Sequence, residues 1–196
     1  MAILNKSESH VEKTLAIIKP NAFPNADEIE QAISAAGFTI VKKNDLQLTH
    51  QQCGDFYIEH FGKPFYEDLK NFMSSDTSRV LVLAKPKAIS EWRHLMGPTD
   101  VATAKKERPD SLRAKYGVGK EKNAVHGSDS YTSAQREIKF FFPELEADPT
   151  SDITDYLTAE VNPILLPALC QLYKDEPDNP VLWLAQWLEK SVKSMT

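Results

Sequence analysis

Short apolar runs alternate with stretches of helical spacing along most of the chain. Residues 14–18 form a mainly apolar run that Lys19 and Pro20 close, and residues 80–84 form the most continuous apolar run. Both have the length and composition of buried strands. Residues 38–42 alternate between apolar and polar positions, which predicts a third strand.

Several segments between these runs have apolar residues three and four positions apart, as a helix with one buried face requires. We predict helices over residues 28–36, 49–60, 64–73, 88–95 and 130–138. Thr49 fits as the N-cap of the second helix, and Gly37 as the terminator of the first. Residues 139–142 then form either an edge strand or a packing anchor.

Residues 99–122 have little apolar pattern and much charge, which predicts a long ordered loop or a pair of short turns. A loop of this length in a compact domain is usually functional. Its basic residues are Lys105, Lys106, Arg108, Arg113, Lys115, Lys120 and Lys122. They form either a solvated surface or a polyphosphate-binding loop, and only the neighbouring motifs can decide.

The alternation of strands and helices indicates an α+β fold over residues 12–145. Neither of the two common nucleotide-binding loops, GxGxxG and GxxxxGK[ST], occurs in the sequence. We therefore predict one antiparallel sheet with helices on one face.

The pattern changes after a polar linker at residues 146–153. Apolar residues then recur every three to four positions along one helix face: Leu157, Val161, Ile164 or Leu165, Ala168 or Leu169, and Leu172. A polar turn follows, in which Asn179 fits as an N-cap and Pro180 as the first helical residue.

The second tail helix has its own apolar side, formed by Leu184, Trp187 and Leu188. Two short helices with one apolar stripe each bury too little surface to be stable alone. We therefore predict a helical hairpin over residues 154–191 that dimerises or docks on a partner.

Charge is unevenly distributed along the 196 residues, whose net charge is −5. From Glu144 onward ten acidic residues face three basic ones, so the tail carries −7 and the rest of the chain +2. This distribution argues against a nucleic-acid-binding protein with a broad basic face. No apolar run approaches the length of a membrane span.

The cysteines and the first residues predict a reducing, cytoplasmic location. Cys53 and Cys170 lie far apart without a CxxC spacing, so neither a disulfide framework nor a zinc site is indicated. The first seven residues lack the basic flank and the long apolar stretch of a signal peptide.

His126 has a context that the other histidines lack. Gly127 permits close backbone approach or an unusual φ. A helix that begins at Ser130 points exposed N–H groups toward the histidine, which favours a phosphate. Glu137 lies eleven residues on, about three helical turns. Its carboxylate could hold one ring nitrogen and leave the other free to attack.

The remaining histidines have no supporting motif. They are His10, His50, His60 and His94, and we assign them to surface or packing roles.

Residues 13–142 resemble the nucleoside diphosphate kinase family throughout. The matching motifs are the segment 14–20, Phe56-Tyr57, the segment 63–69, Arg93 with residues 95–99, the segment 109–113, and Asn123-Ala-Val-His126-Gly-Ser-Asp129. The resemblance implies a ferredoxin-like antiparallel sheet with helices. It also implies ping-pong phosphate transfer from a nucleoside triphosphate to a diphosphate.

The resemblance assigns roles by position. His126 would take the γ-phosphate as phosphohistidine, with Glu137 orienting it and Ser128 supporting that contact. Lys19 and Asn123 would reach the sugar hydroxyls and the migrating phosphate, with Tyr57 nearby. Arg93, Thr99 and Arg113 would hold the other phosphates. Phe65 and Leu69 would pack against the base. Mg²⁺ would arrive with ATP or another triphosphate.

The sequence also departs from the family pattern around the nucleotide loop. Residues 21–24 differ from the usual segment after the first strand, and the segment between Thr99 and Arg113 is longer than usual. Ala114-Lys115 replaces a Gly-Asp pair. Lys120 stands where the family has an apolar residue over the base, and Lys122 where it has arginine. A misplacement of about 1 Å in such a loop can cost ~100-fold in rate.

Residues 155–172 and 177–188 resemble the Dpy-30 motif, whose modules form a dimeric helical bundle that grips an amphipathic helix of a partner. A kinase-type domain joined to this motif is similar to a subgroup associated with the radial spokes of ciliary and flagellar axonemes. Strong kinase activity is not generally attributed to that subgroup.

The resemblance therefore implies a structural subunit of the axonemal radial spoke. It would be located in the cytoplasm and cytoskeleton, and its partners would be other radial spoke proteins or another Dpy-30-type module, without membrane or nucleic acid. Its kinase-like domain would bind nucleotide with weak or no kinase activity. The alternative is an active nucleoside diphosphate kinase.

Overall fold

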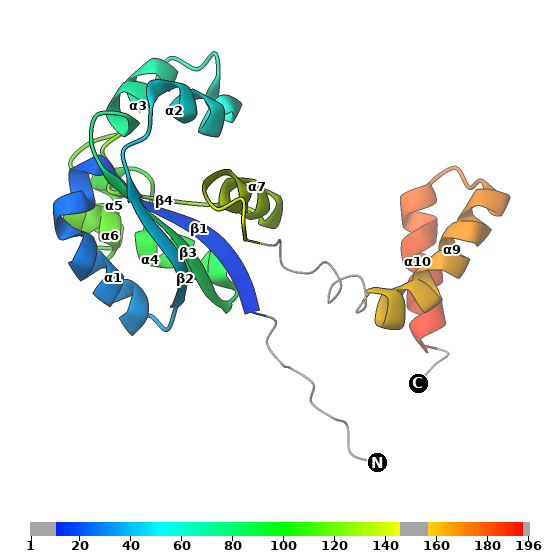
Figure 1. Cartoon of the computed structure of the whole chain (residues 1–196). Helices are drawn as coiled ribbons and strands as arrows, with labels where there is room; N and C mark the ends of the chain where they lie inside the picture. The colour runs from blue at the N-terminus through cyan, green and yellow to red at the C-terminus, as the bar shows by residue number, and fades with distance from the viewer. Residues whose placement is uncertain (1–10, 146–156, 194–196) are drawn as a thin grey trace. The chain divides into compact units, whose positions relative to one another are not determined.

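The computed structural model describes residues 11–145 and 157–193, and the chain divides into two compact units, the first of which ends at Leu145 (Figure 1). Each unit is described separately. His10 and the linker predicted at residues 146–153 lie outside the described residues.

A four-stranded antiparallel sheet forms the centre of the first unit. Its strands are β1 (Val11–Ile18), β2 (Thr39–Leu46), β3 (Ser78–Pro86) and β4 (Val125–Gly127). Their order is β2-β3-β1-β4, and every neighbouring pair is antiparallel (Figure 1). The predicted α+β antiparallel fold is confirmed. The short strand β4 was not predicted.

Helices connect the strands. They are η1 (Pro20–Asn25), α1 (Ala26–Ala35), α2 (His50–Phe56), η2 (Ile58–His60), α3 (Tyr66–Met73), α4 (Ala88–Met96), α5 (Val101–Glu107), α6 (Leu112–Tyr116) and α7 (Tyr131–Phe141). Thr49 caps α2 in a capping box with Gln52, as a helix start requires.

Three local predictions need correction. The helix predicted over 49–60 is divided into α2 and η2. The region 99–122 contains the short helices α5 and α6. Residues 139–141 continue α7, so the edge-strand interpretation is wrong, whereas Phe142 is buried and acts as the packing anchor.

Helices cover both faces of the sheet, so the prediction of helices on one face is wrong. In β1, Ala16 and Ile18 pack with α1 and α4, whereas Leu15 and Ile17 pack with α2, α3 and α7. Alternating side chains point to opposite faces of a strand. The continuous apolar run of β3 is therefore explained by burial on both faces.

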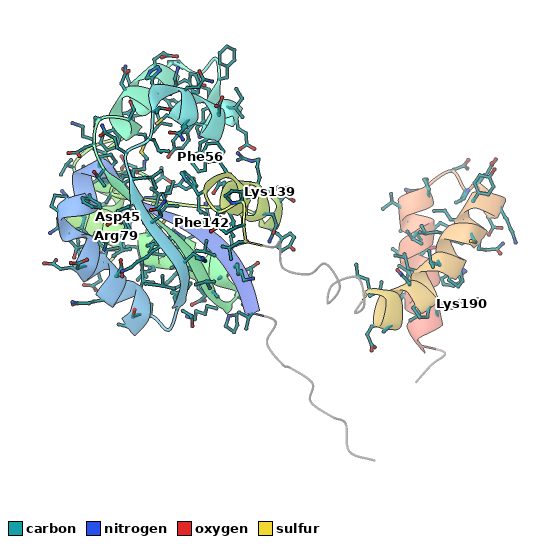
Figure 2. All side chains as sticks on the ribbon, viewed as in Figure 1. Asp45, Phe56, Arg79, Lys139, Phe142 and Lys190 are labelled. Atoms are coloured by element: carbon teal, nitrogen blue, oxygen red, sulfur yellow. The ribbon has the colours of Figure 1, made fainter. Side chains whose placement is uncertain are left out.

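The edge strand β2 is fastened by charge as well as by backbone pairing. Arg79 on β3 donates through Nε to Asp45 Oδ1 on β2 at 2.7 Å, and Figure 2 shows the two side chains on neighbouring strands. The hydrogen bonds that Arg79 donates to Asp45 raise the pKa of Arg79 and lower the pKa of Asp45. Asp45 and Arg79 are directly opposite each other in the β2–β3 register, so the pair adds a side-chain link to a strand whose side chains are mostly exposed.

The second unit is the predicted helical hairpin, with a short π-helical turn (Leu157–Val161) followed by α9 (Asn162–Asp175) and α10 (Pro180–Lys193). Asn179 Oδ1 accepts the N–H of Leu182 at 3.1 Å, which is the predicted N-cap. Within the described residues, no helix combines the length and apolarity that a membrane span needs.

Candidate active site

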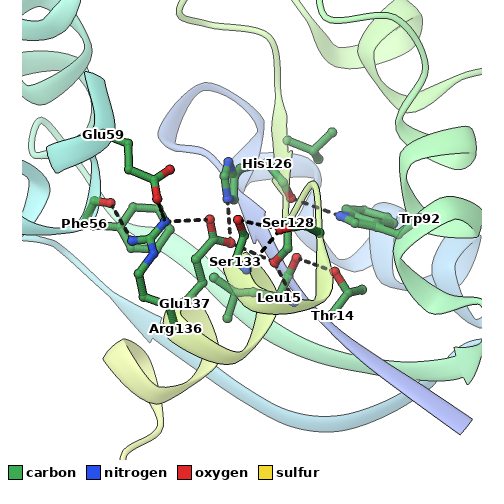
Figure 3. Close-up of polar contacts among 12 residues, drawn as sticks. Thr14, Leu15, Phe56, Glu59, Trp92, His126, Ser128, Ser133, Arg136 and Glu137 are labelled. Atoms are coloured by element: carbon green, nitrogen blue, oxygen red, sulfur yellow. Dashed lines mark hydrogen bonds and ion pairs between the residues drawn. The ribbon is translucent and has the colours of Figure 1, made fainter. Parts of the chain in front are cut away.

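His126 lies on β4 and faces Glu137 of α7 (Figure 3). Its Nε2 is 3.0 Å from Glu137 Oε2, and the Ser128 hydroxyl donates to the same oxygen at 2.8 Å. Ser128 Oγ in turn accepts the N–H of Leu15 on β1 at 3.3 Å. The sheet therefore holds Ser128, Ser128 holds the carboxylate, and the carboxylate holds the imidazole.

This arrangement distinguishes the two nitrogens of the imidazole. An ionised carboxylate only accepts hydrogen bonds, so Nε2 carries the hydrogen and the lone pair lies on Nδ1. Within the described part of the chain, Nδ1 forms no hydrogen bond. The side chain of His126 is 22% exposed. Nδ1 is therefore the nitrogen available as a nucleophile.

Gly127 lets the indole of Trp92 approach the backbone of β4. A Cβ on Gly127 would overlap the Trp92 ring, and the φ of Gly127 is not positive. Trp92 Nε1 donates to the carbonyl of His126 at 3.1 Å (Figure 3). Of the two predicted reasons for this glycine, close approach is the one that the structure shows.

Two adjoining cavities open beside His126. We call the first the histidine cavity, of about 290 Å³. It is lined by Phe56, Tyr57, Glu59, His60, Arg93, Thr99, Arg113, His126, Gly127, Asp129, Ser133, Arg136 and Glu137. The second, the Phe65 cavity, measures about 320 Å³. It is lined by Lys19, Tyr57, His60, Phe65, Leu69, Thr99, Arg113, Lys120, Glu121, Asn123, Val125 and His126.

The cavities bring the predicted site residues together. Those that line at least one cavity are Lys19, Tyr57, Phe65, Leu69, Arg93, Thr99, Arg113, Asn123, His126 and Glu137. Ser128 is fully buried behind Glu137. The histidine cavity is lined by three arginines and three carboxylates, and the Phe65 cavity has Phe65 and Leu69 as apolar lining.

Arg113 is buried between the cavities and the backbone. It donates from Nη1 to Gly97 O at 2.9 Å and from Nη2 to Val125 O at 3.2 Å. Burial and the neighbouring charge of Arg93 lower the pKa of Arg113 to about 10. The guanidinium is therefore cationic at neutral pH and held in place for an anion.

Lys19 and Asn123 form the inner wall of the Phe65 cavity. Lys19 Nζ donates to Asn123 Oδ1 at 2.7 Å and to the carbonyl of Glu121 at 3.1 Å. Burial, with a further contribution from the charge of Arg113, lowers the pKa of Lys19 to about 7 against an opposing effect of Glu121. An anionic ligand beside Nζ would favour the charged form of this lysine.

Three buried polar atoms around the shared wall have no hydrogen-bond partner among the described residues. They are Tyr57 Oη, His60 Nδ1 and Arg113 Nε. Burial raises the pKa of Tyr57 above its ordinary value, so its hydroxyl remains a donor. Unpaired buried polar groups destabilise a fold unless a ligand or water pairs with them. Their convergence at one wall indicates a polar ligand.

His60 is a site residue that sequence reasoning missed. It lines both cavities, and its ring stacks on Tyr57 with centroids 6.1 Å apart. The predicted packing role is therefore present, and the position of His60 on both cavities adds to it. Burial lowers its pKa, with a smaller contribution from Lys63. The spacing of one helical turn from Tyr57 was the available signal.

The other two described histidines have surface contacts. His50 lies 3.8 Å from Glu67, and His94 contacts Arg108 at 2.8 Å.

The start of α7 is capped by the protein itself. Ser130 Oγ accepts the N–H of Ser133 at 3.1 Å. The prediction that the exposed N–H groups at the start of this helix point toward the histidine is therefore wrong for the N–H of Ser133. Hydrogen bonding with the side chain of Ser133, and to a smaller extent with that of Ser130, lowers the pKa of Asp129.

The comparisons with known proteins agree with this geometry. The profile of the family described as Nucleoside diphosphate kinase matches residues 12–147, and that of the Dpy-30 motif matches residues 153–192. The chain belongs to the nucleoside diphosphate kinase family.

Two similar proteins align with more than nine-tenths of this chain. Nucleoside diphosphate kinase homolog 5 of Homo sapiens is 45% identical over 185 residues, which cover 93% of this chain and 87% of the relative. The homolog 5 of Danio rerio is 46% identical over 181 residues, covering 91% and 83%, respectively. A crystal structure of the Aquifex aeolicus nucleoside diphosphate kinase has a TM-score of 0.66 and 41% identity, covering 67% of this chain and 95% of that chain.

In this member of the family, Arg136 connects the helical hairpin of α2 and α3 to Glu137. Its Nη2 lies 3.2 Å from Glu59 Oε1 and 3.7 Å from Glu137 Oε1, and its Nη1 donates to the carbonyl of Phe56 at 3.4 Å (Figure 3). The two oxygens of Glu137 therefore have different partners, with Arg136 on one and His126 on the other. Sequence reasoning identified neither Arg136 nor Glu59.

Proposed function

We propose that this chain is a structural subunit of the ciliary and flagellar axonemal radial spoke. Its nucleoside diphosphate kinase domain binds a nucleotide with low phosphotransfer activity, and its tail helices dock partners. The pairing of the two domains, shared over most of the chain with the homolog 5 relatives, supports this proposal. The observation that carries the nucleotide-binding part is the adjoining pair of cavities around His126.

The two cavities match the two ends of a nucleotide. Arg93 and Arg113 in the histidine cavity suit a polyphosphate, because guanidinium groups bind phosphate oxygens in pairs. Phe65 and Leu69 in the Phe65 cavity offer a flat apolar surface to a base. Lys19 and Asn123, on the inner wall of the Phe65 cavity, would face the ribose.

Mg²⁺, which the family uses with its nucleotide, fits this site as an ion carried on the phosphates. Among the described residues, no group of three or more His, Cys, Asp or Glu side chains could hold a metal ion. Asp129 lines the histidine cavity, and its lowered pKa keeps the carboxylate ionised beside such an ion. When bound, the ion would neutralise charge on the phosphates.

The tail supports the docking part of the proposal. Leu166, Leu169 and Tyr173 lie three and four residues apart on α9 and are exposed, whereas Ala168 is buried. We call these three residues the α9 stripe. One apolar face of α9 packs within the hairpin, whereas the α9 stripe is exposed. An exposed apolar stripe is what docking of another Dpy-30-type module or of a partner helix requires.

An active nucleoside diphosphate kinase is the second candidate, favoured by the contact between His126 and Glu137. Nδ1 would attack the γ-phosphorus, the bond from that phosphorus to the β–γ bridging oxygen would break, and the diphosphate would leave. A terminal oxygen of a second diphosphate would then take the phosphoryl group from Nδ1. The cationic groups around the cavity would stabilise the charge of both steps.

The position of Lys120 favours low phosphotransfer activity over an active kinase. Its ammonium lies 5.6 Å from the centre of the Phe65 ring, in the space that a base would enter. A base must share this space or displace the side chain, and a shift of about 1 Å in the bound nucleotide can cost ~100-fold in rate.

The spoke assignment is tested by removing the chain from flagellated cells and restoring it. We expect the wild-type chain to fractionate with radial spokes and to restore their assembly. A variant with glutamine at all three positions of the α9 stripe should fold but stay in the soluble fraction. Normal spokes in cells that lack the chain would refute the structural role.

A further inference from the structure

Lys19 is a buried lysine that lines a cavity. It follows the last residue of β1, is 6% exposed, and forms part of the wall of the Phe65 cavity. Within the described part of the chain, its Nζ donates to Asn123 Oδ1 at 2.7 Å and to the carbonyl of Glu121 at 3.1 Å. An ammonium group carries three hydrogens, so one hydrogen of a charged Lys19 exceeds these two acceptors. A neutral amine has two hydrogens, which match the two acceptors, and a lone pair.

The surroundings of Nζ also favour the neutral amine. Burial and the charge of Arg113 lower the pKa of Lys19 to about 7, against an opposing effect of Glu121. The other charged or titratable side chains that line this cavity are Tyr57, His60, Lys120 and His126. About half of Lys19 is therefore neutral at pH 7, whereas an exposed lysine with a pKa of about 10.4 is neutral in fewer than about one molecule in a thousand.

The same cavity contains two further groups that suit an acyl transfer. Arg113 Nε and Tyr57 Oη are buried without a hydrogen-bond partner among the described residues, and both side chains line the Phe65 cavity with Lys19. A guanidinium group binds phosphate oxygens. A hydroxyl group can donate to a carbonyl oxygen on which negative charge develops. The cavity, of about 320 Å³, therefore suits a small molecule with a phosphate at one end and an acyl carbon at the other.

We propose that Lys19 is a site of covalent acylation by small acyl phosphates. The lone pair of Nζ attacks the acyl carbon, and the bond from that carbon to the bridging oxygen breaks. The bridging oxygen takes the electron pair and leaves as part of inorganic phosphate, which also accepts one proton from Nζ. The product is an uncharged amide on Lys19. The reaction itself does not require nucleotide binding, and only its effect on nucleotide affinity rests on the function proposed above.

The alternative is a structural lysine that stays charged and joins the end of β1 to residues 121–123. A buried ammonium group has no lone pair and is poorly accessible. This alternative therefore predicts that Lys19 is acylated more slowly than exposed lysines.

Reaction of the full chain with acetyl phosphate tests the proposal, with peptide mass spectrometry measuring the acetylation rate of each lysine. Lys122, which is exposed, serves as the reference within the same molecule. We expect Lys19 to react about tenfold faster at pH 7, because its larger neutral fraction outweighs the weaker nucleophilicity of a less basic amine. Its rate should level off above about pH 8, whereas that of Lys122 should keep rising about tenfold per unit to pH 9.

Two further measurements test the role of the phosphate end. The wild type is treated with N-hydroxysuccinimidyl acetate, an acetylating reagent without phosphate, and Arg113→Gln is treated with acetyl phosphate. Both should lower the ratio of Lys19 to Lys122 acetylation several-fold. An equal ratio with the two reagents on the wild type would overturn the assignment to acyl phosphates, whether or not Arg113→Gln folds.

Three other results would also overturn the proposal. They are acetylation of Lys19 no faster than that of Lys122, a Lys19 rate that keeps rising to pH 9, and a phosphoryl group on His126 in place of an acetyl group on Lys19. A titration with Mg·ADP separates this proposal from the nucleotide-binding function. Fast acetylation of Lys19 in a chain that binds no Mg·ADP would support the acylation site and refute nucleotide binding.

Discussion

Glu137 Oε2 lies 3.0 Å from Nε2 of His126, and this one contact assigns different roles to the two nitrogens of the imidazole. Glu137 is buried and also accepts the Ser128 hydroxyl, so its position is determined by β1 and α7 together. The nitrogen that remains for chemistry is Nδ1.

The tautomer of His126 is the first prediction. In the wild type we expect the neutral imidazole to carry its hydrogen on Nε2, whereas Glu137→Ala should give a mixture of tautomers because the acceptor is lost. The ¹⁵N chemical shifts of the ring above pH 8 measure this without any need for activity. Glu59→Gln, in the same cavity but without a contact to His126, is the control. An unchanged tautomer in Glu137→Ala would contradict the assigned role.

The second prediction concerns pH and Lys19. Because the pKa of Lys19 is lowered to about 7, its charged fraction falls as pH rises through 7. A bound phosphate favours the charged form, so nucleotide affinity should decrease between pH 7 and 9 by up to about tenfold per unit. Titrations of Mg·ADP at each pH measure the slope. Lys19→Met should bind weakly with a flat profile, and a wild-type affinity that rises with pH would refute the assignment.

Gly127 gives a stability prediction with an internal control. Gly127→Ala should lower the free energy of unfolding by about 1–3 kcal/mol, because the added methyl group overlaps the buried Trp92 ring. Gly119→Ala places its methyl group in open space and should change it little. Urea unfolding of the wild type and the two variants measures the free energies. Equal values for the wild type and Gly127→Ala would contradict the prediction and show that the backbone of β4 can move away from Trp92.

The α9 stripe predicts self-association. Leu169→Gln should weaken a dimer of the full chain, because Leu169 is an exposed apolar residue of the stripe. Lys174→Gln, which places the same side chain outside the stripe on the same helix, should leave the dimer intact. Sedimentation velocity over a concentration series measures the difference. If the wild-type chain is monomeric on its own, the prediction of self-association is wrong, and the α9 stripe would instead bind a different protein.

The strand and helix periods predicted most of the fold, because apolar spacing reflects which face is buried. The continuous apolar run 80–83 also contained the evidence for burial on both faces, since consecutive positions in a strand face opposite sides. The prediction of one covered face ignored this. Strand β4 was missed because its three residues are too short for any period.

The site was predictable where a residue belongs to a motif. His126 and Glu137 share a strand-to-helix segment with a fixed spacing. His60 and Arg136 reach the cavity through tertiary packing of α2, η2 and α7, and no short-range pattern reports such contacts. The same limit applies to Lys120, whose position over Phe65 joins two segments far apart in the sequence.

The measurement that tests the account most directly combines binding and phosphate transfer in one sample. Full-length protein is mixed with γ-labelled ATP or GTP and Mg²⁺, and acid-labile label on His126 is followed in rapid-quench time points, with His126→Asn as the blank. We predict that nucleotide raises the thermal unfolding midpoint, as a ligand of the native state does. We also predict that label appears far more slowly than the roughly 1–1,000 s⁻¹ of ordinary enzymes. Label that forms at those rates and is discharged by added diphosphate would contradict the account and establish an active kinase.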